Sequence, residues 1–249
     1  MAVFLMAQNG KKYLVNIDIN QIPGIIKEKR KIMENTEFIC FTSACGGSGC
    51  TSSAVALARI CSKLKKQKVL VVSLDILSSK MFPMSSAMHS GGMLPTGLTF
   101  GKGAGGDVFS IPLQSDEFGV SYACPESFFN PLHSMSETEL SVFLSALSSS
   151  GRYDLVILDI PFAENISERL CMCCEKIVVV TGYLPYQRSC SRVLLNRFEK
   201  DVAGLEFEPL LFEFAPAEDR DSFSGEGVDI HDQFGAEVRQ LAEELFSSF

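Results

Sequence analysis

The sequence lacks the marks of a membrane or secreted protein. Its apolar runs are shorter than the about 20 residues of a transmembrane helix. The apolar stretch 1–6 is short, and Lys11 and Lys12 follow it, so we expect no signal peptide. The nine cysteines are odd in number and have no disulfide-framework spacing. Reduced thiols in a cytoplasmic protein explain them best.

Common catalytic and metal-binding signatures are also missing. No G-x-S-x-G hydrolase motif occurs, and no ligand spacing relates the histidines, which are His89, His133 and His231. Cys171, Cys173 and Cys174 lie on an expected helix, where C-x-C-C spacing does not direct three thiolates toward one ion. We therefore expect no zinc ion and no iron–sulfur cluster.

An excess of positive charge is absent too. The formal net charge of the 249 residues is −8, so the chain has no general attraction for phosphate backbones, and we expect no nucleic-acid partner. Hydrophobic residues make up 46% of the chain, which is ordinary for a folded protein. The length suits one large α/β domain.

Strand-like apolar runs alternate with helical stretches from residue 37 onward. The runs are 37–43, 68–74, 108–112, 119–123, 154–160, 176–181 and 208–214. This order predicts an α/β fold with a mostly parallel, doubly wound central sheet and helices on both faces. Ligands bind such sheets at the carboxyl ends of the strands. Cys45, Asp75 and Asp159 all lie at or just after such ends.

Three further segments have a predicted role in the organisation. Residues 1–36 form a strand–helix extension that precedes the main domain, 37–249. The Ser-, Gly- and Met-rich stretch 78–106 predicts a long loop beside the site. The last helix, 236–249, has a largely acidic polar face, so it is expected to dock on the sheet rather than on a membrane.

A glycine-rich loop follows the first apolar run and precedes a helix-forming segment. Strand, glycine loop and helix together predict a phosphate-binding loop, in which backbone N–H groups and the helix N-terminus face the anion. The predicted nucleotide-binding residues are Cys45, Gly46, Gly47, Ser48, Gly49, Cys50, Thr51 and Ser52.

This loop resembles the K-G-G-x-G-K-[ST] motif of the MinD/ParA group of P-loop ATPases, and the resemblance spans roughly residues 37–249. Cys45 and Cys50 stand where the motif has its two lysines. The resemblance implies that Thr51 and Asp159 hold Mg²⁺, Asp159 as the Walker B carboxylate of a Y-D-x-(apolar)3-D-x-P strand. It also implies that Asp75 is the acid that positions the attacking water.

Within that group the chain is most similar to CpaE/TadZ-type proteins, which place pilus-assembly machinery. The resemblance implies a cytoplasmic homodimer with ATP and Mg²⁺ as cofactors and pilus or secretion proteins as partners at the cell pole or inner membrane face. Loss of both lysines favours a pseudo-ATPase. One alternative is an active ATPase with a substitute cation, Arg188 or Arg192. Another is a redox switch between Cys45 and Cys50. In these relatives a receiver-like domain precedes the ATPase-like domain, so the strand and helix of residues 1–36 are either a remnant of such a domain or an additional flank.

Overall fold

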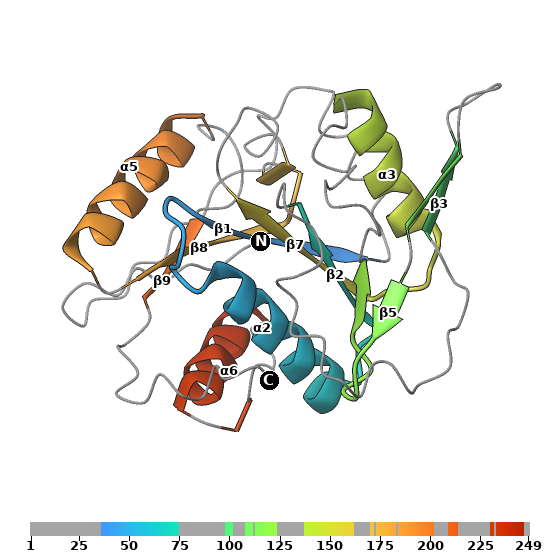
Figure 1. The fold of residues 1–249 in the computed structure, drawn as a ribbon, viewed down its shortest axis with the longest axis horizontal. Coiled ribbons are helices and arrows are strands. Elements are labelled where there is room, and N and C mark those ends of the chain that lie inside the picture. Colours follow the sequence, from blue (N-terminus) through green and yellow to red (C-terminus); the bar gives the residue numbers. More distant parts are fainter. Residues whose placement is uncertain are drawn as a thin grey trace.

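A seven-stranded sheet forms the centre of the computed structural model, in the order β5–β6–β2–β7–β1–β8–β9 (Figure 1). Its strands are β1 (Glu37–Ser43), β2 (Val69–Ser73), β5 (Leu113–Ser115), β6 (Ser121–Ala123), β7 (Leu155–Pro161), β8 (Lys176–Thr181) and β9 (Pro209–Glu213). Neighbouring strands pair in parallel, except that β5 runs antiparallel to β6. The predicted mostly parallel α/β sheet is confirmed.

The structure describes only part of the chain. The described residues are 36–74, 98–101, 108–111, 113–123, 137–161, 170–171, 173–182, 184–201, 209–213, 230–231 and 233–246. The proposed extension therefore lies outside them apart from Thr36, and so does Asp75.

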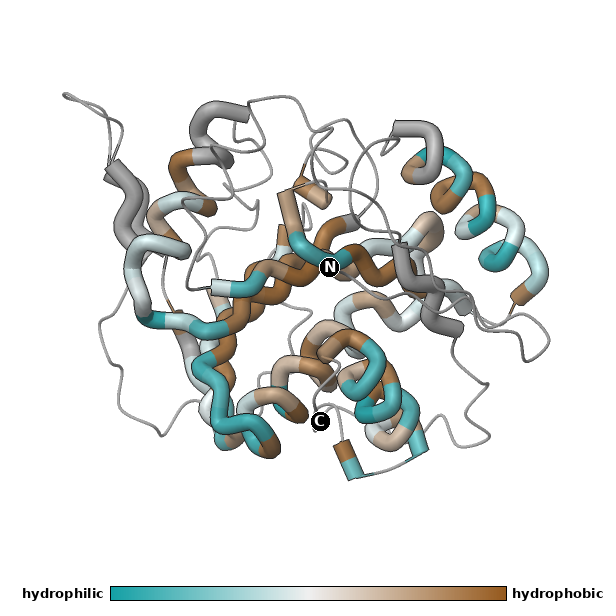
Figure 2. Tube along the Cα trace, turned by 180° about the vertical axis from the view of Figure 1, so that it is seen from behind, coloured by the Kyte–Doolittle hydropathy of each residue, from teal (hydrophilic) through white to brown (hydrophobic). Residues whose placement is uncertain are grey.

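Helices cover both faces of the sheet, as predicted. They are α2 (Cys50–Lys65), α3 (Glu137–Ser149), α5 (Pro185–Asp201) and α6 (Gln233–Leu245). Figure 1 shows α3 and α5 on one face and α2 and α6 on the other. Apolar residues run along the central strands between these layers (Figure 2).

Strand β1 shows why the sequence folds into these layers. Its side chains alternate between the two faces of the sheet. Phe38 and Cys40 belong to the core cluster that includes residues of α3 and α5. Ile39 and Phe41 belong to the cluster that includes residues of α2 and α6. A continuous apolar run is what a strand buried on both faces requires.

Two local predictions were wrong. Leu98–Gly101 lies within the stretch expected to be a loop, but it forms β3, which pairs antiparallel with β4 (Val108–Ile111) in a separate two-stranded sheet. The run 108–112 was expected in the main sheet. A four-residue strand carries too little periodicity for its partner to be read from the sequence.

The last helix docks on the protein, as its charge pattern predicted. Val238, Leu241 and Leu245 of α6 are buried in the core cluster shared with α2. Residues 247–249 of the expected helix lie outside the described residues. Among the described helices, none combines the length and apolar character needed to cross a membrane.

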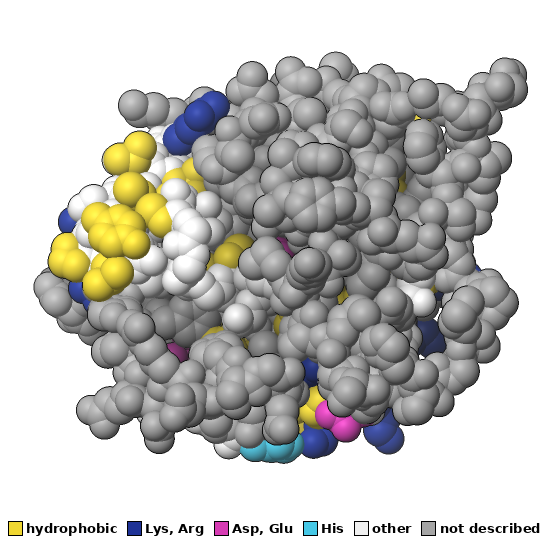
Figure 3. Space-filling view, in the orientation of Figure 1, with side chains coloured by type: hydrophobic (Ala, Val, Ile, Leu, Met, Phe, Trp, Pro, Cys, Tyr) yellow, Lys and Arg dark blue, Asp and Glu magenta, His cyan; other side chains and the backbone are white. Residues whose placement is uncertain are grey.

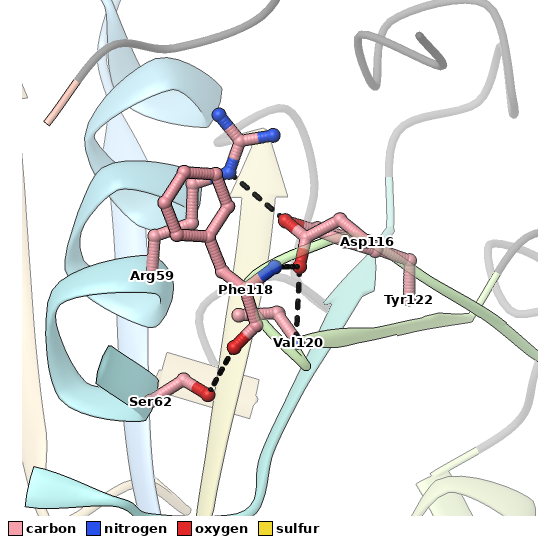
Figure 4. Close-up of polar contacts among 6 residues, drawn as sticks. All are labelled: Arg59, Ser62, Asp116, Phe118, Val120 and Tyr122. Carbon is pink, nitrogen blue, oxygen red and sulfur yellow. Dashed lines mark hydrogen bonds and ion pairs between the residues drawn. The ribbon is translucent and has the colours of Figure 1, made fainter. Parts of the chain in front are cut away.

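A buried ion pair joins α2 to the turn between β5 and β6 (Figure 4). Arg59 Nε donates to Asp116 Oδ2 at 2.9 Å, and the hydroxyl of Tyr122 donates to the same oxygen at 2.7 Å. Asp116 Oδ1 accepts the backbone N–H groups of Phe118 and Val120, each at 3.0 Å. Burial, and then the charge of Asp116, raises the pKa of Tyr122, which keeps it a donor. One carboxylate thus orders the turn and attaches it to α2.

We expect Asp116→Ala to lower the free energy of unfolding by about 3–5 kcal/mol, because Arg59 would remain buried without this partner. Chemical denaturation at neutral pH measures the change. Glu117→Ala, at an exposed position in the same turn, is the matched control and should stay within about 0.5 kcal/mol of the parent. Equal effects of the two substitutions would contradict the assigned role of Asp116.

Candidate functional site

The glycine loop connects the carboxyl end of β1 to the first turn of α2, as predicted. Gly47 has a φ of 71° and Gly49 a φ of 84°, in the left-handed region that favours glycine. Gly49 is the N-cap of α2, and its carbonyl accepts the backbone N–H and the hydroxyl of Ser53, at 2.9 and 2.8 Å. The loop therefore ends at a helix N-terminus, the arrangement that binds phosphate in other proteins.

Asp159 lies directly beside this loop. Parallel pairing places Phe41 of β1 and Ser73 of β2 opposite Asp159 of β7. Thr51 Oγ1, in the first turn of α2, donates to Asp159 Oδ2 at 2.8 Å. The structure thus joins two residues that are 108 positions apart and that the sequence assigned to one site.

Cys50 also faces Asp159. Its Sγ donates to Asp159 Oδ1 at 3.5 Å, and the Ser73 hydroxyl donates to Oδ2 at 3.4 Å. Burial, and then the negative charge of Asp159, raises the pKa of the Cys50 thiol well above its usual value. Cys50 is therefore a neutral donor at neutral pH. These three contacts of the buried Asp159 carboxylate come from uncharged groups.

Two serine side chains form hydrogen bonds within the first half of the loop. The hydroxyls of Ser43 and Ser48 both donate to the Cys45 carbonyl, at 3.2 and 3.0 Å. The sequence placed Ser48 among the nucleotide-binding residues, whereas its buried hydroxyl bonds within the loop. Ser43 was not assigned this role, because a serine at a strand end has no distinctive sequence signal.

Cys45 lies at the start of the loop, and its side chain is half-buried. Burial raises the pKa of the Cys45 thiol above its usual value, and the Cys190 thiol of α5 raises it further. Sequence reasoning considered Cys50 as the partner of Cys45, but Cys50 faces Asp159 instead. No signal in the sequence links Cys190 to the loop.

The remaining predicted residues lie in the loop, in the first turn of α2 and on α5. Gly46 lies in the loop, and a Cβ built there meets nothing within 4 Å. Ser52 lies in the first turn of α2 and is half-buried. The alternative cations, Arg188 and Arg192, are exposed on α5. Within the described part of the chain, no group of three His, Cys, Asp or Glu side chains is arranged to hold a metal ion.

Comparisons with known proteins identify the fold. No protein-family model matches the sequence, and no curated protein matches it either. Solved structures do match. A plasmid partition protein from Borrelia burgdorferi bound to AMPPNP has a TM-score of 0.56 at 14% identity, over 87% of this chain and 100% of that one. The chain has the fold of ParA/MinD-type P-loop proteins.

Two other structural neighbours agree with this assignment. The MinD cell division protein of Aquifex aeolicus has a TM-score of 0.56 at 11% identity, with 86% of this chain and 98% of that chain covered. A ParA family ATPase from Chlorobium tepidum has a TM-score of 0.52 at 14% identity, with 86% and 93% covered. At identities this low, the structural similarity shows a common ParA/MinD-like fold.

The loop geometry predicts different costs for alanine at two neighbouring glycines. A Cβ at Gly46 or Gly47 meets nothing within 4 Å, but only Gly47 of the two has a positive φ. We expect Gly47→Ala to be about 1–2 kcal/mol less stable than Gly46→Ala, because only the first forces a side chain into the left-handed region. Denaturant unfolding of both variants measures the difference, and equal stabilities would contradict the loop conformation.

Proposed function

We propose that this chain is a ParA/MinD-like positioning or assembly factor that binds ATP weakly and hydrolyses it slowly or not at all. The observation that carries the proposal is the contact of Cys50 with Asp159. Cys50 occupies the position of the loop lysine in the family motif, and a neutral thiol supplies no charge to a phosphate. A charge-assisted hydrogen bond contributes about 1.5–3 kcal/mol. Its loss weakens binding roughly 10- to 150-fold.

The residues that remain fit a magnesium nucleotide. Thr51 Oγ1 and Asp159 Oδ2 are 2.8 Å apart, and both are the hard oxygen ligands that Mg²⁺ prefers. Backbone N–H groups of residues 46–51 would face the phosphates. When bound, Mg²⁺ would neutralise phosphate charge. Catalysis is expected to suffer more than binding, because cationic side chains act on charge that develops in the transition state. Asp75 would position the attacking water, as the family resemblance implies.

The biological role that we propose is that of the CpaE/TadZ branch. The tail 234–241 resembles the closing helix of that branch, which supports this role. The chain would form a homodimer across the face that bears the glycine loop. In the cytoplasm it would recruit a pilus or secretion apparatus at the cell pole or inner membrane face. The net charge of −8 disfavours nucleic acid as its partner. A gene neighbourhood without pilus or type II secretion-like components would count against this role.

We expect Cys50→Lys to tighten binding of a fluorescent ATP analogue roughly 10- to 150-fold in the presence of Mg²⁺, because it restores a cation beside the phosphates. Fluorescence titration measures the dissociation constant. Cys50→Gln is the matched control, since it is of similar reach but neutral, and its affinity should stay near that of the parent. Tight Mg²⁺-dependent binding by the parent itself, or an ATPase rate that Asp159→Asn abolishes, would overturn the pseudo-ATPase proposal.

A second candidate function is an active but divergent ATPase that uses Arg188 or Arg192 in place of the lysines. The hydrogen bond of 2.8 Å between Thr51 and Asp159 favours it, because both residues expected to hold Mg²⁺ lie together.

The double variant Arg188→Ala/Arg192→Ala separates the two candidate functions. Under the pseudo-ATPase proposal we expect the affinity for the ATP analogue to change less than about threefold, because neither arginine contributes to binding. Arg197→Ala, farther along the same helix, is the control. A loss of tenfold or more in the double variant alone would favour the active ATPase.

A further inference from the structure

Two cysteines from distant parts of the chain meet in the core, on the face of the sheet that α3 and α5 cover. Cys40 lies in β1, and Cys171 lies shortly before β8. Their sulfur atoms are 3.1 Å apart, although 131 positions separate the two residues. A disulfide needs a sulfur–sulfur distance of about 2.05 Å, so a movement of roughly 1 Å brings the pair to bonding distance. The fold therefore holds these two thiols ready to be joined.

Burial makes this pair slow to react. Both side chains are fully buried in the core cluster that includes residues of α3 and α5. Burial, and then the hydrogen bond with Cys171, raises the pKa of the Cys40 thiol well above its usual value. Because the thiolate is the reactive form, Cys40 responds to prolonged oxidation rather than to a brief exposure.

A third cysteine lies in the same cluster, but its thiol is directed to the backbone. Cys174 is buried, and its Sγ donates to the Leu170 carbonyl at 3.4 Å. The sulfur–sulfur contact of the cluster is the one between Cys40 and Cys171. The geometry therefore favours one pairing over the others.

The turn that follows Cys171 lies at the surface. Cys173 is half-buried and Glu175 is exposed. Short-range backbone hydrogen bonds close this turn, from Cys173 N–H to the Leu170 carbonyl at 2.9 Å and from Cys174 N–H to the Cys171 carbonyl at 3.1 Å. Opening one surface turn costs less free energy than global unfolding. Hydrogen peroxide, which is small and uncharged, reaches Cys171 through such an opening.

We propose that Cys40 and Cys171 are a redox modification site, at which a peroxide converts two buried thiols into a disulfide that ties β1 to the segment before β8. The Cys171 thiolate attacks hydrogen peroxide, which gives a sulfenic acid and releases hydroxide. The Cys40 thiolate then displaces hydroxide from the sulfenic sulfur. The protons of the two thiols convert both hydroxides into water, and two electrons pass from the sulfur atoms to the peroxide. A small thiol reverses the bond by thiol–disulfide exchange.

The bond is expected to stabilise the fold. It closes a loop across 131 positions of the chain, and long loops lose the most entropy in the unfolded state. The two thiols already touch in the folded state, so the bond requires little change there. We expect oxidation to raise the midpoint of thermal unfolding by roughly 10 °C. Neither the bond nor this shift depends on the proposed nucleotide binding.

Differential alkylation tests the disulfide directly. The full-length protein is incubated for hours with one equivalent of hydrogen peroxide, unfolded, and treated with iodoacetamide to block free thiols. It is then reduced, treated with N-ethylmaleimide, and analysed by mass spectrometry of its tryptic peptides. We expect the second label on Cys40 and Cys171. Cys61 is the matched control, because it is equally buried but belongs to the other core cluster, and it should carry the first label.

The exposed Cys190 is the reference for accessible thiols. It lies on α5, over which hydrophobic side chains gather on the surface in Figure 3, and the exposed ones include Tyr186 and Val193. Iodoacetamide added to the reduced, folded protein should modify Cys190 well before Cys40 or Cys171. Rapid modification of the buried pair in the folded protein would contradict their enclosure and overturn the proposed slow response.

Two variants test the pairing. Cys171→Ala should leave Cys40 with the first label after peroxide treatment, whereas Cys174→Ala should keep the second label on both members of the pair. First labels on both Cys40 and Cys171 in the oxidised parent would overturn the proposal, and so would a bond from either one to Cys174. The parent result decides even where a variant fails to fold.

Thermal unfolding then tests the consequence. Peroxide treatment should raise the midpoint of the parent and of Cys61→Ala by roughly 10 °C and leave that of Cys171→Ala unchanged. An unchanged or lower midpoint in a parent that carries the bond would reject the stabilising effect, while the labelling result would stand. Failure of the protein to bind the ATP analogue would reject the proposed function and leave both of these measurements unaffected.

Discussion

Parallel pairing of β1 with β7 is the constraint on which the candidate site depends. It sets Phe41 opposite Asp159, two residues before β1 ends at Ser43. Because both strands end at the same edge of the sheet, the loop and the carboxylate meet without any contribution from the long connections between them. The apolar side chains of β1, buried on both faces, hold this register, since a slip of one residue would exchange the two faces.

The chemistry of the site follows from which groups meet Asp159. Its carboxylate accepts hydrogen bonds from the hydroxyls of Thr51 and Ser73 and from the thiol of Cys50. All three donors are neutral. Under the proposed function, this arrangement would keep the oxygen ligands suited to Mg²⁺ without the lysine of the motif that the loop resembles. The fold does not need that lysine, because its stability comes from the buried sheet and from contacts such as Arg59–Asp116.

Much of the architecture was predictable from local patterns. Continuous apolar runs identified β1, β2, β7 and β8, because strands buried on both faces need such runs. Glycines between a strand and a helix identified the loop, because its left-handed backbone favours glycine. The short strands β3 and β5 escaped prediction, because three or four residues carry no reliable period. Their pairing depends on partners that flank them in the fold.

The order of strands and helices along the sequence was enough to predict that Cys45, Thr51 and Asp159 lie at one edge of a parallel sheet. Strand direction and alternation with helices leave few other arrangements. Which groups these residues face was decided by the folded chain. Cys50, in the first turn of α2, turns toward Asp159, and the Cys45 carbonyl accepts the hydroxyls of Ser43 and Ser48. A helix can present any side of its first turn to a neighbouring strand, and only the tertiary packing of side chains selects one.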